Sequence, residues 1–484
     1  MSAISFFIND QPHEVSDLSS NLTLLNYLRY YADLPGTKEG CAEGDCGACS
    51  VVVLESEEER HYFRAINSCL LFLPALHGRR VYTVEGLQSK ESLHPTQEAM
   101  VRHLGSQCGY CTPGFVMSLF EACYREDMVS DWQLDDQLCG NLCRCTGYQP
   151  IRAAGKDVAG LSPQDAFKAY LSHPVTPLPA LAYEHESSQF WRPNSFESLF
   201  SLRQKYPQAR LIAGATDLAL DVTKFNRSLD QLISLEGIAE LKKISRDERG
   251  WLIGSGVTLS RLESALAGRL PSLENMLRYF ASRQIKNRAT VGGNIANASP
   301  IGDLAPVFLS LDAVFHLRGP KGVREVASQD FFLDYRKTAI EPLEIMEAVF
   351  IPALSTMCYA NAYKVSKRKE MDISAVAAGF CIERNAQGEV VRARFGFGGM
   401  AATPKRATLA EKQIVGSQLY SVSIKKTLDA LKDDFKPLSD HRGTSWYREQ
   451  VARNLLLGFF EEALKKEKAN TIKAGALAHP EVGL

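Results

Sequence analysis

The N-terminal part of the chain has a hydrophobic pattern that predicts strands and one short helix. Apolar side chains occupy every second position of Ile4–Ile8, and Asn9 and Asp10 follow as a turn pair. Leucines at positions 22, 24, 25 and 28 recur at helical spacing. Two valine-rich runs predict further strands, Val51–Leu54 and Val81–Val84. This order of elements is typical of a β-grasp fold, which we expect over residues 1–86.

Helical spacing replaces this pattern farther along the chain. We expect Thr112 to cap a helix and Pro113 to occupy its first position. The apolar residues that follow recur three and four positions apart, at Phe115, Val116, Leu119, Phe120 and Cys123. A mainly helical unit is therefore predicted over residues 87–165.

The remainder is predicted to form a linker and two α+β units. Residues 166–189 contain several prolines and no period, which predicts an extended linker. One unit is expected from Phe190 to residue 355 and another over residues 356–470. Val451–Lys468 is rich in helix formers, and residues 471–484 are expected to be a loose tail.

The composition excludes two classes of protein. The chain has 484 residues, which suggests three domains at about 150 residues each. Its net charge of −1 argues against a nucleic-acid or membrane-surface protein. The longest apolar run, Cys69–Leu76, is far shorter than the ~18 residues of a membrane span. Because the start shows no signal-peptide pattern, we expect a cytoplasmic protein.

The charge is divided unevenly along the chain. Residues 1–150 carry 20 acidic and 10 basic side chains, whereas the remainder carries 36 and 45. Either the two parts dock against each other, or they are ordinary domains of different isoelectric point. The acidic run Glu55–Glu59 is expected to be a solvated turn.

Ten of the twelve cysteines lie in the first 145 residues, and they fall into two sets. Without an export signal, clustered cysteines favour metal binding over disulfides. The first set has the C-x4-C-x2-C spacing of plant-type [2Fe–2S] ferredoxins with a distant fourth ligand, and consists of Cys41, Cys46, Cys49 and Cys69. Nearby glycines, at 40, 44 and 47, let the loop wrap around a cluster. A structural zinc site is the alternative, although zinc sites usually have paired C-x2-C knuckles.

The second set combines a C-x2-C pair with a later C-x-C pair, and consists of Cys108, Cys111, Cys143 and Cys145. One pair can hold one iron and the other pair the second iron. Cys111 lies at a predicted helix start, where the helix dipole favours an anionic cluster. Cys139 is a weaker candidate ligand and Cys123 a core residue. Cys358 and Cys381 stand alone in the sequence and are expected to be buried structural thiols.

Two loops with small side chains are candidate phosphate-binding segments. They are Leu211–Leu218 and Thr290–Asp303, in which backbone N–H groups could approach a pyrophosphate. Neither matches the G-x-G-x-x-G pattern, so a Rossmann fold is disfavoured. Tight turns in an ordinary α+β domain explain the loops equally well.

Two different [2Fe–2S] motifs in this order resemble the molybdenum hydroxylases, the family of xanthine dehydrogenase and aldehyde oxidase. Gln107–Gly114 and Asn141–Tyr148 are similar to the family's signature for the second cluster. The resemblance covers about residues 1–470. It implies a β-grasp [2Fe–2S] ferredoxin domain, a helical-bundle [2Fe–2S] domain, a vanillyl-alcohol-oxidase-type FAD-binding domain and an α+β C-terminal flavoprotein subdomain.

The resemblance also implies which residues contact FAD. The diphosphate and ribityl parts would lie on two segments, namely Leu211, Ile212, Ala213, Gly214, Ala215, Thr216, Asp217 and Leu218, and Thr290, Val291, Gly292, Gly293 and Asn294. Phe280 would lie against the flavin, and Asp303 would hydrogen-bond to the cofactor. Met346 and Lys364 match further positions, and a lysine beside the flavin would stabilise its reduced anion. Tyr335 would lie near the nicotinamide of NAD, and Ser366–Ile373 matches a charged loop near the flavin.

The implied function is electron transfer within a xanthine dehydrogenase complex that oxidises hypoxanthine and xanthine to urate. Because the molybdenum-cofactor domain of longer members does not follow, we expect that cofactor in a large partner subunit of a heteromer. Electrons would pass to the second cluster, then to the first, then to FAD and NAD. Alternatives are an aldehyde or N-heterocycle hydroxylase, a non-catalytic iron–sulfur redox sensor, and a zinc-binding interaction module. No residue of this chain is expected to act on the purine.

Overall fold

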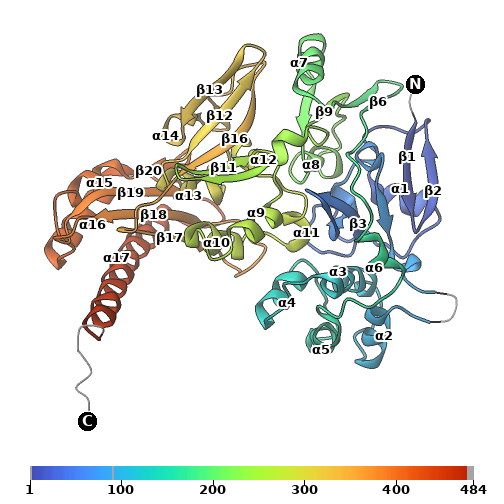
Figure 1. Ribbon diagram of the computed structural model, residues 1–484, viewed down its shortest axis with the longest axis horizontal. Coiled ribbons are helices and arrows are strands. Elements are labelled where there is room, and N and C mark those ends of the chain that lie inside the picture. Colours follow the sequence, from blue (N-terminus) through green and yellow to red (C-terminus); the bar gives the residue numbers. More distant parts are fainter. Residues whose placement is uncertain (1–2, 90–91, 477–484) are drawn as a thin grey trace.

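The protein consists of four packed units, with the two N-terminal units one above the other at one end and the C-terminal unit at the opposite end of the long axis (Figure 1). The computed structural model describes residues 3–89 and 92–476, and of residues 467–476 only the backbone. A central unit, residues 181–352, separates a C-terminal unit from the two N-terminal units. The architecture is multidomain α+β, as predicted.

The first unit is a mixed five-stranded sheet packed on one helix. The sheet order is β2-β1-β5-β3-β4 and the strands are β1 (Ile4–Ile8), β2 (Gln11–Val15), β3 (Ser50–Glu57), β4 (Arg60–Asn67) and β5 (Arg80–Tyr82). Asn9 and Asp10 form the β1–β2 turn with φ of 50° and 64°, which confirms the predicted turn. The helix α1 (Leu24–Tyr30) buries Leu24, Leu25 and Leu28, so the leucine spacing also predicted its element correctly.

The second unit is helical. Its helices are α2 (Pro95–Arg102), α3 (Thr112–Tyr124), α4 (Asp131–Leu138), α5 (Gln149–Val158) and α6 (Ala166–Tyr170). Helix α3 is central, because every residue from Gly114 to Tyr124 is buried. The predicted cap is off by one residue, since Cys111 itself is the N-cap and Thr112 is the first helical residue.

The central unit contains two sheets connected by short helices. The smaller sheet, in the order β6-β7-β9-β8, consists of β6 (Leu181–His185), β7 (Ser188–Arg192), β9 (Gln231–Ser234) and β8 (Arg210–Ile212). The larger, antiparallel sheet consists of β10 (Ile244–Asp247), β11 (Gly250–Gly254), β16 (Ile345–Pro352), β12 (Val314–Gly319) and β13 (Gly322–Ala327).

Short elements fill the connections of the central unit. The helices are α7 (Phe196–Lys205), α8 (Ala219–Thr223), α9 (Leu259–Leu266), α10 (Pro271–Arg278), α11 (Arg283–Lys286), α12 (Val291–Ala296), α13 (Leu304–Ser310) and α14 (Ser328–Phe331), and the paired strands are β14 (Phe332–Asp334) and β15 (Lys337–Thr338). Helix α11 lies where the central unit meets both N-terminal units (Figure 1).

The C-terminal unit is an antiparallel sheet between helices. Its strands are β17 (Cys358–Val365), β18 (Val376–Arg384), β19 (Val390–Gly398) and β20 (Lys405–Arg406), and its helices are α15 (Thr408–Ile414), α16 (Ser421–Asp434) and α17 (Ser445–Ala476). Alternate residues of β18, such as Phe380, pack on these helices, whereas Gly379 faces α13 of the central unit. Because side chains alternate between the two faces of a strand, one face of β18 packs on the C-terminal helices and the other on the central unit.

Two sequence expectations are corrected here. The predicted linker, residues 166–189, contains helix α6, strand β6 and the start of β7. Strands β6 and β7 form a hairpin at the edge of the smaller sheet of the central unit. The predicted tail from residue 471 begins too early, because α17 continues to Ala476; residues 477–484 lie outside the described part. Among the described helices, none combines the length and the apolar character that crossing a membrane requires.

Candidate iron–sulfur and flavin sites

The first cysteine set lies on a loop between α1 and β3 and on the segment after β4. The sulfurs of Cys49 and Cys69 are 3.4 Å apart, and the side chains of Cys41 and Cys46 are within hydrogen-bonding reach of each other. Backbone N–H groups of Glu43 and Asp45 donate to Cys41 Sγ at 3.4 and 3.3 Å. The hydrogen bond from Cys46 lowers the pKa of Cys41 to about 5. The same contact raises the pKa of Cys46, so the pair favours one thiolate, and the loop supplies N–H donors to that sulfur, as an anionic cluster requires.

The second set lines a hollow of 460 Å³ at the surface of the helical unit. All four cysteines contribute to its wall, together with Tyr110, Leu142, Arg144 and Tyr148. Cys108 contacts Cys145, and Cys111 contacts Cys143. This pairing corrects the expectation that each sequence motif holds one iron, because each contact joins one cysteine from each motif.

Both sets thus present sulfurs in two pairs. Among the residues that the structure describes, no group of three or more Cys, His, Asp or Glu side chains is close enough to hold one metal ion. Two sulfur pairs suit a cluster with two bridged irons, in which each iron takes two protein ligands. Tetrahedral zinc would instead need four ligands around one point. The residues present therefore fit [2Fe–2S] clusters.

The two cluster loops are in direct contact. The backbone N–H of Leu142 donates to the carbonyl of Cys46 at 3.0 Å. The side chain of Asn141 donates to the carbonyl of Gly47 at 3.2 Å. Gly47 has φ +69°, and a Cβ there would lie 2.3 Å from the carbonyl oxygen of Gly140, so only glycine permits this approach.

The remaining cysteines are not part of either set. Burial raises the pKa of Cys123 and of Cys139 to about 12, as expected of core thiols. Cys358 and Cys381 do not stand alone as expected, because adjacent strands bring them together. Cys358 lies opposite Glu383 and Cys381 opposite Ala360, and the two thiols contact each other diagonally. The sequence separation of these cysteines concealed the pair.

A cavity of about 680 Å³ lies in the central unit, at its border with the first unit. Most predicted FAD residues line it, namely residues 211–218, Phe280, Thr290, Gly292, Gly293, Asn294 and Met346. A Cβ at Gly214 would lie 1.8 Å from the carbonyl oxygen of Arg288, so the two loops touch only because residue 214 is glycine. The buried side-chain oxygen of Asn294 has no hydrogen-bond partner within the described part of the chain. The size, the small-residue walls and this open acceptor fit a dinucleotide cofactor.

Three predicted residues lie outside the cavity wall. Val291 is fully buried in the core of the central unit. Asp303 and Lys364 form an ion pair of 2.8 Å, and Ser374 donates to Asp303 at 2.5 Å. The ammonium of Lys364 lies 5.9 Å from the centre of the Phe280 ring. The ion pair therefore lies next to Phe280, whose ring lines the cavity.

Charged residues from two units complete the cavity, and the sequence did not indicate them. Glu55 pairs with Arg79 at 3.1 Å and with Arg288 at 3.2 Å, and Glu236 pairs with the same two arginines. The expectation that Glu55–Glu59 is a solvated turn is confirmed for Glu58 and Glu59, which are exposed in the β3–β4 turn, and is wrong for Glu55, which lies in β3 and forms interdomain ion pairs. Only the excess of acidic residues before 150 and of basic residues after it hinted at such docking.

The predicted NAD-side residues are at the surface. Tyr335 is 61 % exposed in the turn between β14 and β15. In the segment 366–373, Asp372 accepts a hydrogen bond from the backbone of Arg368 at 2.9 Å, and Ile373 reaches the cavity wall. Burial raises the pKa of Asp45, and charges on Arg368 and Asp372 also act on it. This segment thus lies close to both the first cluster loop and the cavity.

Four family models match the chain in the order of its units. They are "2Fe-2S iron-sulfur cluster binding domain" over residues 6–73, "[2Fe-2S] binding domain" over 83–156, "FAD binding domain in molybdopterin dehydrogenase" over 185–354 and "CO dehydrogenase flavoprotein C-terminal domain" over 361–463.

Whole-chain similarity is found with xanthine dehydrogenases. The xanthine dehydrogenase of Emericella nidulans is 31 % identical, and the match covers 97 % of this chain and 39 % of that protein. The xanthine dehydrogenase of Oryza sativa subsp. japonica is 33 % identical, and the match covers 88 % of this chain and 37 % of that protein. Among solved structures, the reconstituted CO dehydrogenase from Oligotropha carboxidovorans has a chain with TM-score 0.53 and 30 % identity, covering 56 % of this chain and 95 % of that one. A chain of the CO dehydrogenase from Hydrogenophaga pseudoflava has a TM-score of 0.54 and 25 % identity, and the match covers 57 % of this chain and 98 % of that one.

Fold, cysteine sets and cavity define a multidomain iron–sulfur flavoprotein with two [2Fe–2S] domains and one FAD-binding domain. The chain spans about two fifths of the length of the xanthine dehydrogenases that it matches. It belongs to the molybdenum hydroxylase family of oxidoreductases, and within that family it is an iron–sulfur and FAD electron-transfer module.

Proposed function

We propose that this chain is the electron-transfer subunit of a xanthine dehydrogenase complex. It would accept electrons from a molybdenum cofactor in a large partner subunit and deliver them to NAD. The observation that carries the proposal is the contact between the Leu142 N–H and the Cys46 carbonyl at 3.0 Å, together with a cavity shared by the first and central units. Similarity to xanthine dehydrogenases over nearly the whole chain supports the purine substrate.

The residues have distinct proposed roles. The ligands would be Cys41, Cys46, Cys49 and Cys69 for the first cluster and Cys108, Cys111, Cys143 and Cys145 for the second. FAD would lie on the loops at 211–218 and 290–294, with Phe280, Asp303, Met346 and Lys364 around the flavin. When bound, the clusters would carry single electrons, and FAD would combine two of them for hydride transfer to NAD.

The exposed second cysteine set supports a partner at that surface. Cys108 and Cys145 are exposed, and Tyr110 and Leu142 beside them are 49 % and 45 % exposed. Apolar side chains around a redox centre suit a protein interface. We propose that the large subunit docks here. Because CO dehydrogenase chains share the fold of this module, the substrate can differ between enzymes that contain it, and an aldehyde or N-heterocycle hydroxylase is the second candidate.

An anaerobic absorbance spectrum of the purified chain, with iron and flavin quantified, tests the proposal. We expect two irons for each cysteine set, one FAD per chain and bleaching by NADH. Cys46→Ser and Cys143→Ser should each remove the spectroscopic signal of one cluster only, whereas Cys123→Ser should remove neither. A colourless, zinc-containing sample would contradict the cluster assignment. Iron without flavin would favour a redox sensor, and a loaded complex inactive on xanthine would favour another substrate.

A further inference from the structure

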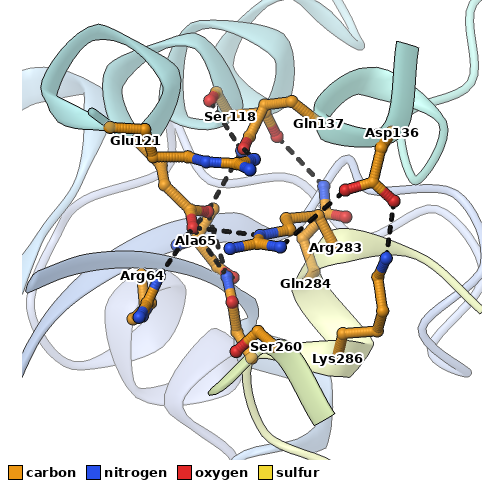
Figure 2. A network of polar contacts seen from close by, with 12 residues as sticks. Arg64, Ala65, Ser118, Glu121, Asp136, Gln137, Ser260, Arg283, Gln284 and Lys286 are labelled. Atoms are coloured by element: carbon orange, nitrogen blue, oxygen red, sulfur yellow. Dashed lines mark hydrogen bonds and ion pairs between the residues drawn. The ribbon is translucent and has the colours of Figure 1, made fainter. Parts of the chain in front are cut away.

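Helix α11 of the central unit is inserted between the two cluster-bearing units and held there by buried charges (Figure 2). Lys286, fully buried, donates to Asp136 at 2.6 Å and to Glu263 at 2.9 Å. Arg283 pairs with Glu263 at 3.1 Å and with the fully buried Glu121 of α3 at 3.4 Å. Carboxylates of the helical unit and of α9 in the central unit thus match the two positive charges of α11 and fix its position.

Gln284 is the residue of α11 that faces the cluster loops. It is 1 % exposed, and its side-chain amide donates to Asn141 Oδ1 at 2.8 Å, to Ser118 Oγ at 3.0 Å and to Ser50 Oγ at 3.4 Å. Its side-chain oxygen lies against Gly140, where a Cβ would be only 2.0 Å away. No other residue of α11 contacts both Ser50 and Asn141 through the hydrogen bonds found in the described chain.

Two of these acceptors, Ser50 and Asn141, both donate to the carbonyl of Gly47 in the first cluster loop. Ser50 directly follows Cys49 and donates to the carbonyl of Gly47 at 2.7 Å. Asn141, two residues before Cys143, donates to that carbonyl at 3.2 Å. A hydrogen bond from Gln284 to the oxygen of each donor restrains its orientation, and Ser118 Oγ donates to the same Asn141 oxygen at 2.7 Å.

We propose that Gln284 is a positioning residue through which the flavin-binding unit fixes both cluster loops relative to each other. Hydrogen bonding around cluster sulfurs sets the reduction potential of a cluster. Loss of the Gln284 amide would remove one restraint from Ser50 and one from Asn141, loosen the turn at Gly47 and weaken N–H donation to the sulfurs. The proposal requires the two clusters only, and not the identity of substrate or acceptor.

The test is a redox titration of the holoprotein, followed by electron paramagnetic resonance of both reduced clusters. The variant is Gln284→Met, which keeps the side-chain length and removes the donor. The matched control is Gln137→Met. Gln137 is also fully buried in this network, but it donates to Ser118 O and Glu121 at 3.0 Å, and none of its hydrogen bonds in the described chain reaches a cluster loop.

We expect Gln284→Met to lower the midpoint potential of the first cluster and to change the magnetic interaction between the clusters, with iron and FAD content retained. Gln137→Met should reduce thermal stability and leave the potentials as in the wild type. Unchanged potentials in Gln284→Met, or equal shifts in both variants, would overturn the proposal. If Gln284→Met does not fold, Gln284→Asn replaces it. The shorter amide cannot reach both loops, so the same shift is expected, and its absence is equally decisive.

Discussion

At the scale of single residues, the ion pair behind the flavin cavity is the clearest preorganised feature. Lys364 and Asp303 are 3 % and 9 % exposed in their side chains, and Ser374 holds the second carboxylate oxygen. A buried cation with a fixed partner keeps its position without cofactor bound. The position of this pair is therefore fixed by residues of the chain itself.

We expect Lys364→Met to lower the reduction potential of bound FAD, because the positive charge that stabilises reduced, anionic flavin is removed. Spectroelectrochemistry of the flavin measures this shift. Lys369→Met is the control, since Lys369 is 70 % exposed, pairs with neighbouring Glu370 at 3.6 Å and lies 5.7 Å from the centre of the Tyr279 ring. An unchanged flavin potential in Lys364→Met with FAD retained would place the lysine outside the flavin environment.

The Cys358–Cys381 pair predicts selective thiol reactivity. A hydrogen bond from Cys381, only partly offset by burial, lowers the pKa of Cys358 to about 7. The thiolate is the reactive form, so alkylation by iodoacetamide should rise with pH and reach half its maximum near pH 7. Peptide mass spectrometry resolves the site. Cys123, with a pKa raised by burial to about 12, should stay unmodified in the folded chain.

At the scale of elements, α11 depends on contacts that no local pattern reveals. Four residues are too few to give a helical period, and two of them, Arg283 and Lys286, read as surface residues in sequence. Their carboxylate partners come from α3, α4 and α9, which are far apart in the chain. Charge burial of this kind follows from tertiary packing alone.

Lys286→Met should destabilise the protein strongly, by about 3–5 kcal/mol, because Asp136 and Glu263 would remain in the interior with less compensation. Urea denaturation followed by fluorescence and circular dichroism gives the shift in midpoint. The control is Lys156→Met, which removes an exposed pair with Asp131 at 3.2 Å and should have no measurable effect. Similar midpoints for the two variants would refute a stabilising role for the buried network.

The sequence predicted elements with strong local signals and missed those defined by distant partners. The turn at Asn9 and Asp10, the leucine helix and both cysteine sets were found because residue type and spacing alone determine them. Strand β6 was missed, because the proline-rich segment before it resembles a linker and its strand character comes from pairing with β7. The interdomain role of Glu55 was equally invisible, since it depends on Arg288, more than two hundred residues away.

At the scale of the whole molecule, the acidic and basic parts of the chain meet at an interface that contains ion pairs between them. Glu55, Glu58, Glu121 and Asp136 from the acidic part pair with Arg288, Arg261, Arg283 and Lys286 from the basic part. Of the two interpretations open from the sequence, mutual docking is therefore the one that the structure supports.

Glu236 makes this docking dependent on pH. Burial raises its pKa, but Arg288 and Arg79 outweigh burial and hold the value at about 2, below the ordinary 4.5. Because the folded pKa is lowered, the stabilisation is complete above about pH 4.5 and is lost as pH falls towards 2.

Glu236→Gln should therefore be less stable than the wild type at pH 7, by up to about 3 kcal/mol for a shift of this size. The difference should begin to narrow below about pH 4.5, because the wild-type carboxyl then gains a proton in the unfolded chain. Denaturation midpoints of both proteins across pH 7 to pH 3 measure it. A difference that stays constant with pH would show that the charge of Glu236 contributes nothing.

The extended segment between α6 and β6 is the single covalent link from the cluster-bearing half to the flavin-bearing half. Non-covalent contacts around α11, Glu55 and Glu236 already hold these halves together. We therefore expect the two halves to remain assembled without peptide continuity across residues 172–180. The same architecture could be encoded as two polypeptides, and a gene divided at this segment should yield fragments that associate into one redox unit.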